Sequence, residues 1–323
     1  DLRDSLRAMA VLWLGEAGVE ALVDPAALVD GLAEAFANLA RFSETDAARI
    51  DGTDGATGYL SVFPAVDHGG DLASAKVLAG RPANAAEGRP EIDAVVIAAE
   101  PTTGEIAAIL SARRLTAYRT AGVTALALRL LGVRSATVAL AGTGLQARTH
   151  ARVLIETGIA ERVIIASASR GMEAAEAFLA SLPPAIAARC GAVPLAGLAG
   201  QADALVTLSL AATPLPIGAL PDEGILVGVG PFYPEAHELD PSLVASAETV
   251  ISDHPERLCR QWAGHAVASR ALIGIDDLAA GCASAPAQGR RIVLSDGRAF
   301  EDNVAARQIL AAARATGRGH PLP

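Results

Sequence analysis

The stretch Ser135-Ala-Thr-Val-Ala-Leu-Ala-Gly-Thr-Gly-Leu-Gln-Ala-Arg-Thr-His150 decides the fold of this chain. Its apolar, β-branched run from Thr137 to Leu140 predicts a short buried strand, and a helix is expected to begin near Leu145. The turn between them is Gly142-Thr143-Gly144. A strand, a glycine turn and a helix in this order are typical of the first unit of a dinucleotide-binding fold.

Each position of this turn has a physical role in holding a nucleotide. Gly142 would allow the tight turn, Gly144 would let the backbone approach a pyrophosphate, and Ala147 is small enough for close helix–strand packing. Leu145 and Gln146 open the helix, whose N-terminus offers N–H groups and a partial positive charge to phosphates. Ordinary strand-to-helix turns can contain the same glycines, so the flanking strand and helix carry the prediction of a cofactor site.

The second strand, expected within residues 162–170, indicates which nucleotide is bound. Its end lies about 20 residues beyond the glycine turn, where an NAD enzyme carries Asp or Glu for the ribose hydroxyls. This chain has Ser167, Ser169 and Arg170 there instead. Hydroxyls and a guanidinium can hold a 2′-phosphate, and no carboxylate repels it. The sequence therefore predicts NADP(H) as the preferred cofactor, with NAD(H) as the alternative; Arg170 could also be a solvated turn residue.

The composition excludes several classes of protein. Aromatic residues are 3% of the 323 residues while hydrophobic residues are 51%, as in an alanine-rich α/β protein. A net charge of −10 argues against nucleic acids and anionic membrane surfaces as partners. Cys190, Cys259 and Cys282 are widely spaced, which predicts neither a disulfide framework nor a zinc site and fits the cytoplasm. No apolar run reaches about 18 residues, and the apolar start from Met9 to Leu14 is too short for a signal peptide.

The N-terminal part is expected to fold as an α+β unit. Asp24-Pro25 predicts a helix start, with Asp24 as the cap and Pro25 in the first turn. Turn-sized gaps between apolar runs predict an antiparallel sheet. Its strands are expected at Gly58–Phe63, Ala73–Leu78, Ile92–Ala98 and Ile106–Leu110. A long helix, Ala121–Leu131, is expected to lead into the nucleotide strand.

The C-terminal part alternates strands and helices, which predicts a parallel, doubly wound sheet over residues 120–295. After the second nucleotide strand we expect a helix at Met172–Leu182 and strands at Ala204–Leu208, Ile225–Val229 and Glu248–Ile251, the last of the sheet. The acidic pair Asp276-Asp277 is interpreted as a solvated helix start. A closing helix, Asn303–Ala313, would return to the first domain.

Several segments taken together resemble one family. They are Lys76-Val-Leu-Ala-Gly-Arg-Pro-Ala-Asn84, Leu115-Thr-Ala-Tyr-Arg-Thr-Ala121, Leu140-Ala-Gly-Thr-Gly-Leu-Gln-Ala147, Ala202-Asp-Ala-Leu-Val-Thr207, Pro234–Leu239 and Ser295-Asp-Gly-Arg-Ala-Phe-Glu-Asp302. In this order they are similar to the ornithine cyclodeaminase/μ-crystallin family. The resemblance implies a substrate-binding and dimerisation domain (1–119 and 296–323), a Rossmann-type dinucleotide domain (120–295), and a homodimer.

The resemblance also implies a substrate site for α-amino or α-imino acids. Lys76 is similar to the active-site lysine of the family, and Arg119 matches the arginine of its Leu-Thr-x-x-Arg-Thr-Ala motif. Arg49 falls at about the right distance before Phe63-Pro64 to match a further arginine. Guanidinium groups bind a carboxylate bidentately, and a lysine can orient or protonate an imine nitrogen. Each basic residue could instead be a surface or ion-pair side chain.

One departure from the family indicates the reaction. Its cyclodeaminases carry an Asp in a Gly-Gly-Asp-x-Pro-Gly-Lys-x-Glu-Leu segment, and here Val229-Gly-Pro-Phe-Tyr-Pro-Glu-Ala-His-Glu-Leu239 places Phe232 at that position. An aromatic side chain cannot act as a general base. The Gly-x-Phe-x-Pro version resembles the branch that reduces Δ1-pyrroline-2-carboxylate and Δ1-piperideine-2-carboxylate. Phe232 could alternatively pack beneath the nicotinamide, which also favours a reductase.

Other polar residues are less decisive. Thr207 and Ser209 end a strand of the nucleotide domain and are expected near the nicotinamide ribose. His237, His254 and His265 show no metal-ligand spacing, so no metal site is predicted, and a structural role is favoured for His265. Asp302 matches a family position, and could equally cap the helix expected from Asn303.

The sequence thus predicts an NAD(P)H-dependent oxidoreductase that reduces a cyclic 2-imino acid to L-proline or L-pipecolate by hydride transfer to C2. The alternatives within the family are ornithine cyclodeaminase, alanine dehydrogenase and N-alkyl amino acid dehydrogenase. An alternative of another class is a non-catalytic protein that binds NADPH and a small ligand, as μ-crystallin does. The retained Lys76, Arg119 and glycine turn favour an enzyme.

Overall fold

The structure, a computed structural model, describes residues 11–52, 58–70, 72–218 and 220–322. The chain divides into two compact units. Unit 1 comprises Asp1–Gly31, Asn38–Arg119 and Arg298–Pro323, and unit 2 comprises Leu32–Ala37 and Thr120–Gly297. Met9, from the apolar start, lies outside the described residues, whereas Leu12–Leu14 form the first strand, β1.

Unit 1 contains a mainly antiparallel sheet, as the apolar runs predict. Its strands are β1 (Leu12–Leu14), β2 (Phe42–Glu44), β3 (Ala48–Asp51), β4 (Tyr59–Asp67), β5 (Ala73–Gly80), β6 (Ile92–Ala99), β7 (Ile106–Ser111) and β18 (His320–Pro321). They follow the order β18-β1-β7-β6-β5-β4-β2, with β3 also paired to β4. Strand β4 continues four residues beyond the predicted end at Phe63. The parallel pair of β1 and β7 was not predicted.

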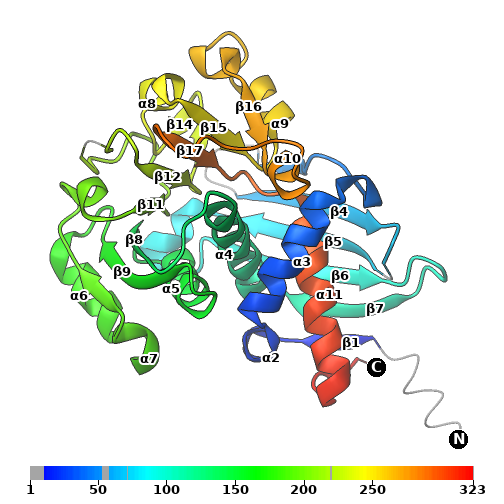
Figure 1. Cartoon of the computed structure of the whole chain (residues 1–323). Helices are drawn as coiled ribbons and strands as arrows, with labels where there is room; N and C mark the ends of the chain where they lie inside the picture. Colours follow the sequence, from blue (N-terminus) through cyan, green and yellow to red (C-terminus); the bar gives the residue numbers. More distant parts are fainter. Residues whose placement is uncertain (1–10, 53–57, 71, 219, 323) are drawn as a thin grey trace, which may run out of the picture. The chain divides into compact units, whose positions relative to one another are not determined.

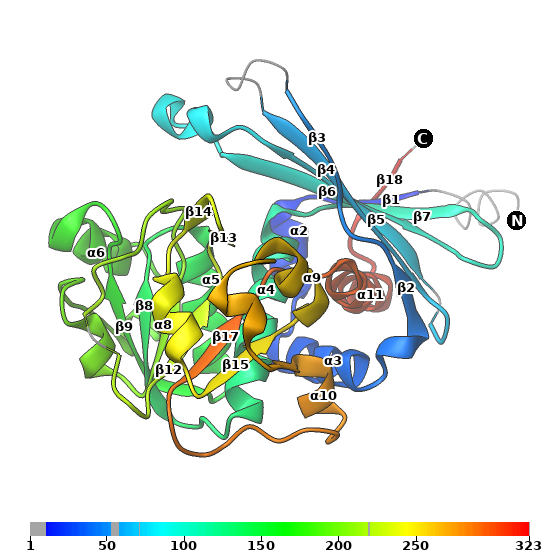
Figure 2. The same ribbon diagram turned by 90° about the horizontal axis from the view of Figure 1, so that it is seen from above.

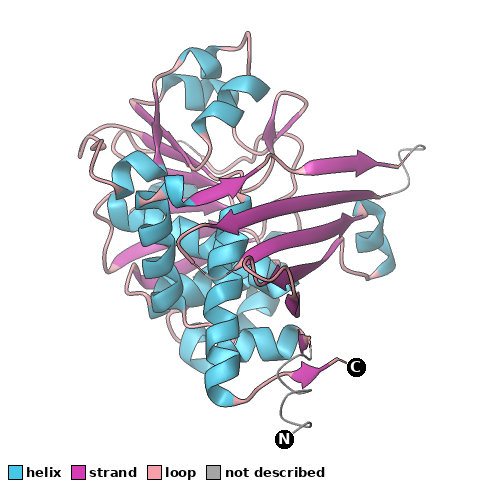
Figure 3. Cartoon of the chain, turned by 90° about the vertical axis from the view of Figure 1, so that its right-hand side faces the viewer, coloured by secondary structure: helices cyan, strands magenta, loops and turns pink. Residues whose placement is uncertain are grey.

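Helix α11 (Ala299–Thr316) packs along β4 and β5 of this sheet (Figures 1 and 3). The prediction that it begins at Asn303 was wrong, because its N-terminus is held from a distant part of the chain. The backbone N–H of Phe300 donates to Glu44 Oε2 at 2.9 Å, and Glu44 lies on β2. Asp302 therefore lies inside the helix and does not cap it.

Helix α4 (Arg113–Leu130) shows the same effect. It begins eight residues before the predicted Ala121 because Glu16, from α2 (Glu16–Leu22), accepts the N–H groups of Arg113 and Arg114 at 3.1 and 3.0 Å. Arg119 consequently lies inside a helix. Helix α3 (Pro25–Ala37), in contrast, begins as predicted, since Asp24 Oδ1 accepts the N–H groups of Ala26 and Ala27.

The two faces of the unit 1 sheet differ. The face toward α11 carries the buried residues of each strand, among them Ala65, Lys76 and Val96. On the opposite face no described element of unit 1 covers the strands, as seen from above in Figure 2. That face carries half-buried or exposed apolar side chains, namely Ile50, Leu60, Val62, Val77, Val95, Ile97 and Ile109.

Unit 2 is built around a doubly wound parallel sheet, which confirms the predicted fold class. The order is β10-β9-β8-β11-β12-β17-β15-β16, and all neighbouring strands are parallel. The strands are β8 (Ala136–Ala141), β9 (Ala160–Ala166), β10 (Cys190–Ala192), β11 (Ala204–Thr207), β12 (Ile225–Gly228), β15 (Thr249–Ser252), β16 (Leu272–Gly274) and β17 (Arg291–Leu294). The expectation that Glu248–Ile251 is the last strand was wrong, because β17 enters between β12 and β15 after a long excursion.

The helices of unit 2 are mostly short. They are α5 (Leu145–Glu156), α6 (Gly171–Ala180), α7 (Pro184–Ala187), α8 (Pro241–Ser246), α9 (Pro255–Gln261) and α10 (Ile275–Ala279). Short 3-10 helices occur at Leu198–Gln201 and Ala266–Ser269 in unit 2, and at Leu39–Arg41 and Pro82–Glu87 in unit 1. A two-stranded hairpin in unit 2 joins β13 (Phe232–Tyr233) to β14 (Ala236–His237). Asp276 and Asp277 lie in the first turn of α10, which confirms the helix start predicted there.

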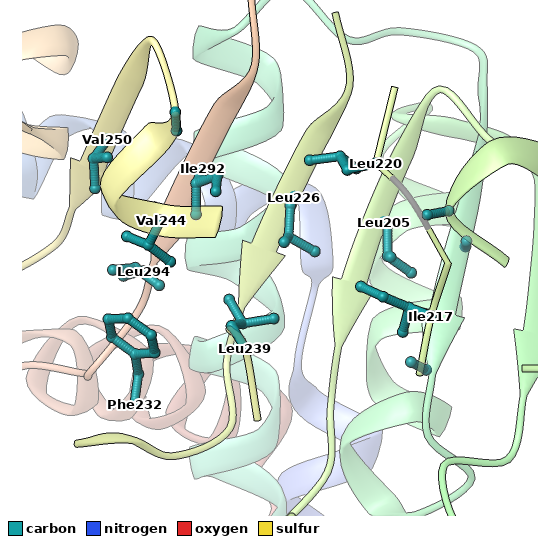
Figure 4. Close-up of a cluster of buried hydrophobic side chains, with 14 of the residues drawn as sticks. Leu205, Ile217, Leu220, Leu226, Phe232, Leu239, Val244, Val250, Ile292 and Leu294 are labelled. Carbon is teal, nitrogen blue, oxygen red and sulfur yellow. The ribbon is translucent and has the colours of Figure 1, made fainter. Parts of the chain in front are cut away.

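One face of the parallel sheet carries a large apolar core (Figure 4). Leu205, Leu226 and Ile292 project from neighbouring strands, and Leu239 and Phe232 lie against them near the carboxyl ends of the strands. This core fixes the loops that follow β11 and β12. No helix in the described part of the chain is both long and apolar enough to cross a membrane.

Candidate functional site

A cluster of four buried charges lies in unit 1, between the sheet and α11. Lys76 Nζ on β5 is 2.7 Å from Asp302 Oδ2 on α11. Arg119 on α4 donates from Nε to Asp302 Oδ1 at 3.2 Å and from Nη1 to Glu301 Oε2 at 2.6 Å. Asp302 therefore bridges the lysine and the arginine that the sequence singled out. The structure brings Lys76 and Arg119 together as predicted, within a charge-balanced group.

Lys76 is an unusual lysine. It is the only lysine in the sequence, whose other basic side chains, histidine aside, are all arginine. Its side chain is 1% exposed, and Nζ lies 4.5 Å from the centre of the Phe63 ring. Burial, and secondarily the Arg119 guanidinium, lower the pKa of Lys76 from 10.5 to about 8, although Asp302 and Glu301 oppose the shift. An amine with this pKa can give up a proton near neutral pH, which a guanidinium cannot.

The two carboxylates of this cluster were not among the predicted site residues. Charges this deeply buried persist only when paired, and Glu301 and Asp302 supply the pairing from the first turn of α11. The family-like segment that ends in Glu301-Asp302 was the one available signal. It could not show the pairing, because the partners come from distant parts of the chain.

Arg49, the third basic residue predicted for the substrate site, lies on β3. It lies opposite Ser61, so it shares the sheet face of Lys76. Its exposed side chain pairs with Asp51 at 2.7 Å and stacks on the ring of Tyr59 at 3.8 Å. Both of these contacts are with residues of its own hairpin, β3 and β4. Its predicted part in substrate binding thus remains a prediction.

In unit 2, the glycine turn connects β8 to α5 as predicted. A Cβ at Gly142 would lie 2.6 Å from the carbonyl oxygen of Leu208, so this position needs glycine for close backbone approach. The turn itself needs no left-handed backbone, since Gly142 and Gly144 are not among the positive-φ glycines. A Cβ at Gly144 would meet no protein atom within 4 Å, and Gly144 is the N-cap of α5. Leu145, Gln146 and the buried Ala147 form the first turn, so the N-terminus of α5 fits a phosphate group.

The residues after β9 lie beside this turn. Ser167 is buried, and its Oγ accepts the backbone N–H of Arg170 at 3.0 Å. Ser169 and Arg170 are exposed, and Arg170 Nη2 donates to Thr143 Oγ1 at 3.0 Å. The Arg170 guanidinium is therefore held at the edge of the glycine turn, and it is not merely a solvated turn residue.

Thr207 and Ser209 are occupied by a partner that sequence reasoning missed. Thr207 Oγ1 donates to Glu238 Oε1 at 2.6 Å, and Ser209 Oγ donates to Glu238 Oε2 at 2.7 Å. Thr207 is fully buried, so a ligand would not reach its hydroxyl in this arrangement. The predicted contact of Thr207 and Ser209 with a ribose remains a prediction; Ser209 is half-buried at the strand end.

Phe232, His237 and His265 lie around the indole ring of Trp262. The Phe232 ring lies 4.6 Å from the ring of Trp262, whose Nε1 donates to the carbonyl of Phe232 at 3.0 Å. His237 and His265 flank the same indole at 6.0 and 5.4 Å, and His254 is the N-cap of α9. Among the described residues, no group of three or more His, Cys, Asp or Glu side chains could hold a metal ion.

The profile of the ornithine cyclodeaminase/mu-crystallin family matches residues 9–317, almost the whole chain. The chain belongs to this family. The match includes both the charge cluster of unit 1 and the glycine turn of unit 2, so the resemblance predicted from the sequence motifs is confirmed.

Two relatives within this family are reductases by name. The chain is 34% identical to Delta(1)-pyrroline-2-carboxylate reductase 1 of Burkholderia multivorans over 73% of this chain and 75% of that protein. It is 36% identical to Delta(1)-pyrroline-2-carboxylate reductase 2 of Burkholderia ambifaria, over 57% of this chain and 58% of that protein. The second match thus spans less than two thirds of the relative.

The present chain shares its fold with a solved structure. It is the Delta(1)-pyrroline-2-carboxylate reductase of Thermococcus litoralis in complex with NADH and L-proline. The TM-score is 0.85 at 19% sequence identity, and the comparison covers 97% of this chain and 100% of the other. At this identity the likeness establishes the architecture of the chain.

Proposed function

We propose that this chain is an NAD(P)H-dependent reductase of a cyclic 2-imino acid, Δ1-pyrroline-2-carboxylate or Δ1-piperideine-2-carboxylate, and forms L-proline or L-pipecolate. The observation that carries the proposal is the buried Lys76, ion-paired to Asp302 beside Arg119. A proton-donating amine next to a guanidinium suits a substrate that has an imine nitrogen beside a carboxylate. The names of the family members described above agree with this substrate class.

Each residue has a distinct part in the proposed reaction. Arg119 binds the substrate carboxylate, because a guanidinium matches its two oxygens. Lys76 Nζ donates a proton toward the imine nitrogen, which makes C2 a better hydride acceptor. The reduced nicotinamide supplies the hydride. Asp302 holds both cations, so the carboxyl and imine groups of the substrate meet a fixed pair of donors.

Phe232 separates this function from that of a cyclodeaminase. It stands where cyclodeaminases are expected to carry an Asp, and its buried ring packs against Trp262. No base is available at that position for ammonia elimination. This supports the reductase over the ornithine cyclodeaminase alternative.

The test follows NADPH absorbance with Δ1-pyrroline-2-carboxylate, Δ1-piperideine-2-carboxylate and L-ornithine in parallel. Oxidation of NADPH with either imine, and no reaction with ornithine, is the expected result. Proline and ammonia from ornithine would favour the cyclodeaminase. Tight NADPH binding without turnover of any imino acid would favour a non-catalytic binding protein.

The pH profile follows from the lowered pKa of Lys76. With a pKa of about 8, the amine is protonated below pH 8 and loses its donor proton above it. Since the proton is needed for imine reduction, kcat should be level below pH 8 and fall about tenfold per pH unit above it. The only lysine in the chain gives a single side-chain Cε signal, so carbon-13 NMR of labelled protein measures the same pKa directly. A pKa near 10.5 would contradict the account.

The preference for NADPH rests on Arg170 and Ser169. The exposed Arg170 guanidinium, anchored by Thr143, and the exposed Ser169 fit a 2′-phosphate. Arg170→Ala is expected to lower kcat/KM for NADPH by roughly tenfold or more and leave NADH little changed, because one charge-assisted contact is lost. Arg148→Ala, which removes a guanidinium bound to Ser181, is the matched control. An equal loss with both cofactors would contradict this assignment.

We also infer a homodimer, with unit 1 as the substrate and dimerisation domain and unit 2 as the dinucleotide domain. The support is the open apolar face of the unit 1 sheet, where Ile50 and Leu60 are 73% and 44% exposed. Contiguous apolar surface of this kind usually marks a protein interface. The cytoplasmic location remains a prediction that rests on three separate free cysteines.

A further inference from the structure

Glu238 is a buried carboxylate that the proposed reaction does not use. It follows β14 and is 1% exposed. Four donors surround it. Oε1 accepts Thr207 Oγ1 at 2.6 Å and the N–H of Gly230 at 2.7 Å, and Oε2 accepts Ser209 Oγ at 2.7 Å and the N–H of Ser209 at 3.0 Å.

These contacts favour the ionised form of Glu238. Each carboxylate oxygen accepts one backbone N–H, a group that can only donate, and one side-chain hydroxyl. Burial raises the pKa of Glu238 above its ordinary value of 4.5, and the hydrogen bonds from Thr207, Ser209 and Gly230 oppose this shift. A fully hydrogen-bonded anion is the arrangement in which a buried carboxylate keeps its charge.

The carboxylate joins the ends of two neighbouring strands. Thr207 is the last residue of β11, Ser209 follows it, and Gly230 comes two residues after the end of β12. A Cβ at Gly230 would lie 2.4 Å from the Glu238 carboxyl carbon, so glycine is required beside it. The loop that follows β11 also contacts the glycine turn. Its residue Leu208 has the carbonyl oxygen that would lie 2.6 Å from a Cβ at Gly142.

The sheet topology indicates which half of a dinucleotide would bind near Glu238. A doubly wound domain has two mononucleotide-binding halves, and the pyrophosphate lies at the glycine turn between them. The adenosine half belongs to β8 and β9, where Ser169 and Arg170 lie. The nicotinamide half then falls on the other side of β8, over the carboxyl ends of β11 and β12 that Glu238 joins.

We propose that Glu238 is a positioning residue that sets the floor of the nicotinamide pocket and favours the oxidised cofactor through its negative charge. This inference rests on the proposed function, since it needs a nicotinamide cofactor. The oxidised ring carries a positive charge and the reduced ring is neutral. A fixed anion near the ring therefore stabilises the oxidised form more than the reduced form.

The test measures the dissociation constants of NADP+ and NADPH for wild type and Glu238→Gln by fluorescence and calorimetry. The variant keeps the size of the side chain and removes the charge. NADP+ should weaken at least tenfold more than NADPH, because at an effective dielectric constant of about 20 two unit charges within about 10 Å of each other change affinity by more than tenfold. An unchanged ratio of the two constants would overturn the inference, and a wild type that binds neither form would overturn the proposed function as well.

Thr207→Val is the matched control, because it removes the hydroxyl that donates to Glu238 and to the Val227 carbonyl and keeps the charge of Glu238. Both forms should weaken by a similar factor, with the ratio of dissociation constants at the wild-type value. If Glu238→Gln does not fold, the dissociation constants of Thr207→Val test the positioning role in its place. Wild-type affinity for both forms in Thr207→Val would then overturn the positioning role.

Discussion

Replacing Lys76 by methionine is expected to lower kcat for Δ1-pyrroline-2-carboxylate reduction by roughly 100-fold or more, the scale of a general acid. Methionine keeps an unbranched side chain beside Phe63 but has no proton to donate. No other lysine exists in the sequence to take over. Steady-state NADPH oxidation at saturating cofactor measures the effect.

Lys76→Arg separates proton donation from charge. Arginine keeps a cation for Asp302, yet its guanidinium holds its protons at any physiological pH. We expect kcat to remain low while NADPH affinity stays at the wild-type value, which also checks folding. Near-wild-type kcat in this variant would mean that Lys76 acts only as a charge.

Arg119→Ala is expected to lower kcat/KM by roughly 100-fold or more, mainly through KM, because the bidentate carboxylate contact is lost. The same change removes the cation 2.6 Å from Glu301 Oε2. Breaking a buried ion pair by removing one partner costs about 3–5 kcal/mol of the free energy of unfolding. Steady-state kinetics and denaturant unfolding measure the two effects separately.

The double variant Arg119→Ala/Glu301→Gln distinguishes binding from folding. In Arg119→Ala the buried Glu301 carboxylate has lost its cation, which destabilises the fold. Replacing Glu301 by the neutral glutamine removes this penalty, so part of the free energy of unfolding should return. The value of kcat/KM should stay low, since no guanidinium is restored. Recovery of kcat/KM together with stability would show that Arg119 serves the fold and not the substrate.

The sequence was most informative where the physical signal is local. The turn between β8 and α5 was predicted to the residue, because an apolar strand, two glycines and a helix start are consecutive. Four strands of unit 1, β4, β5, β6 and β7, were predicted for the same reason, as apolar runs with turn-sized gaps between them, whereas β1, β2, β3 and β18 were not predicted.

The errors lie where distant groups decide. Helices α4 and α11 begin earlier than expected because Glu16 and Glu44, from other elements, accept their first N–H groups. No capping residue close in sequence marks the first residue of either helix, so the sequence alone does not predict it. The charge cluster shows the same limit: the motifs predicted Lys76 and Arg119, while Glu301 and Asp302 became visible as their partners only in the folded chain. Glu238 served only to align a segment, and its four donors come from three separate positions of the fold.

The most direct test of the central claim follows the hydride itself. NADPH carrying deuterium at both C4 positions is incubated with Δ1-pyrroline-2-carboxylate, and the product is analysed by mass spectrometry and NMR. We expect L-proline with one deuterium at C2 and one NADP+ formed for each proline. Proline without deuterium at C2, or no proline while NADPH is still bound, would contradict the central claim.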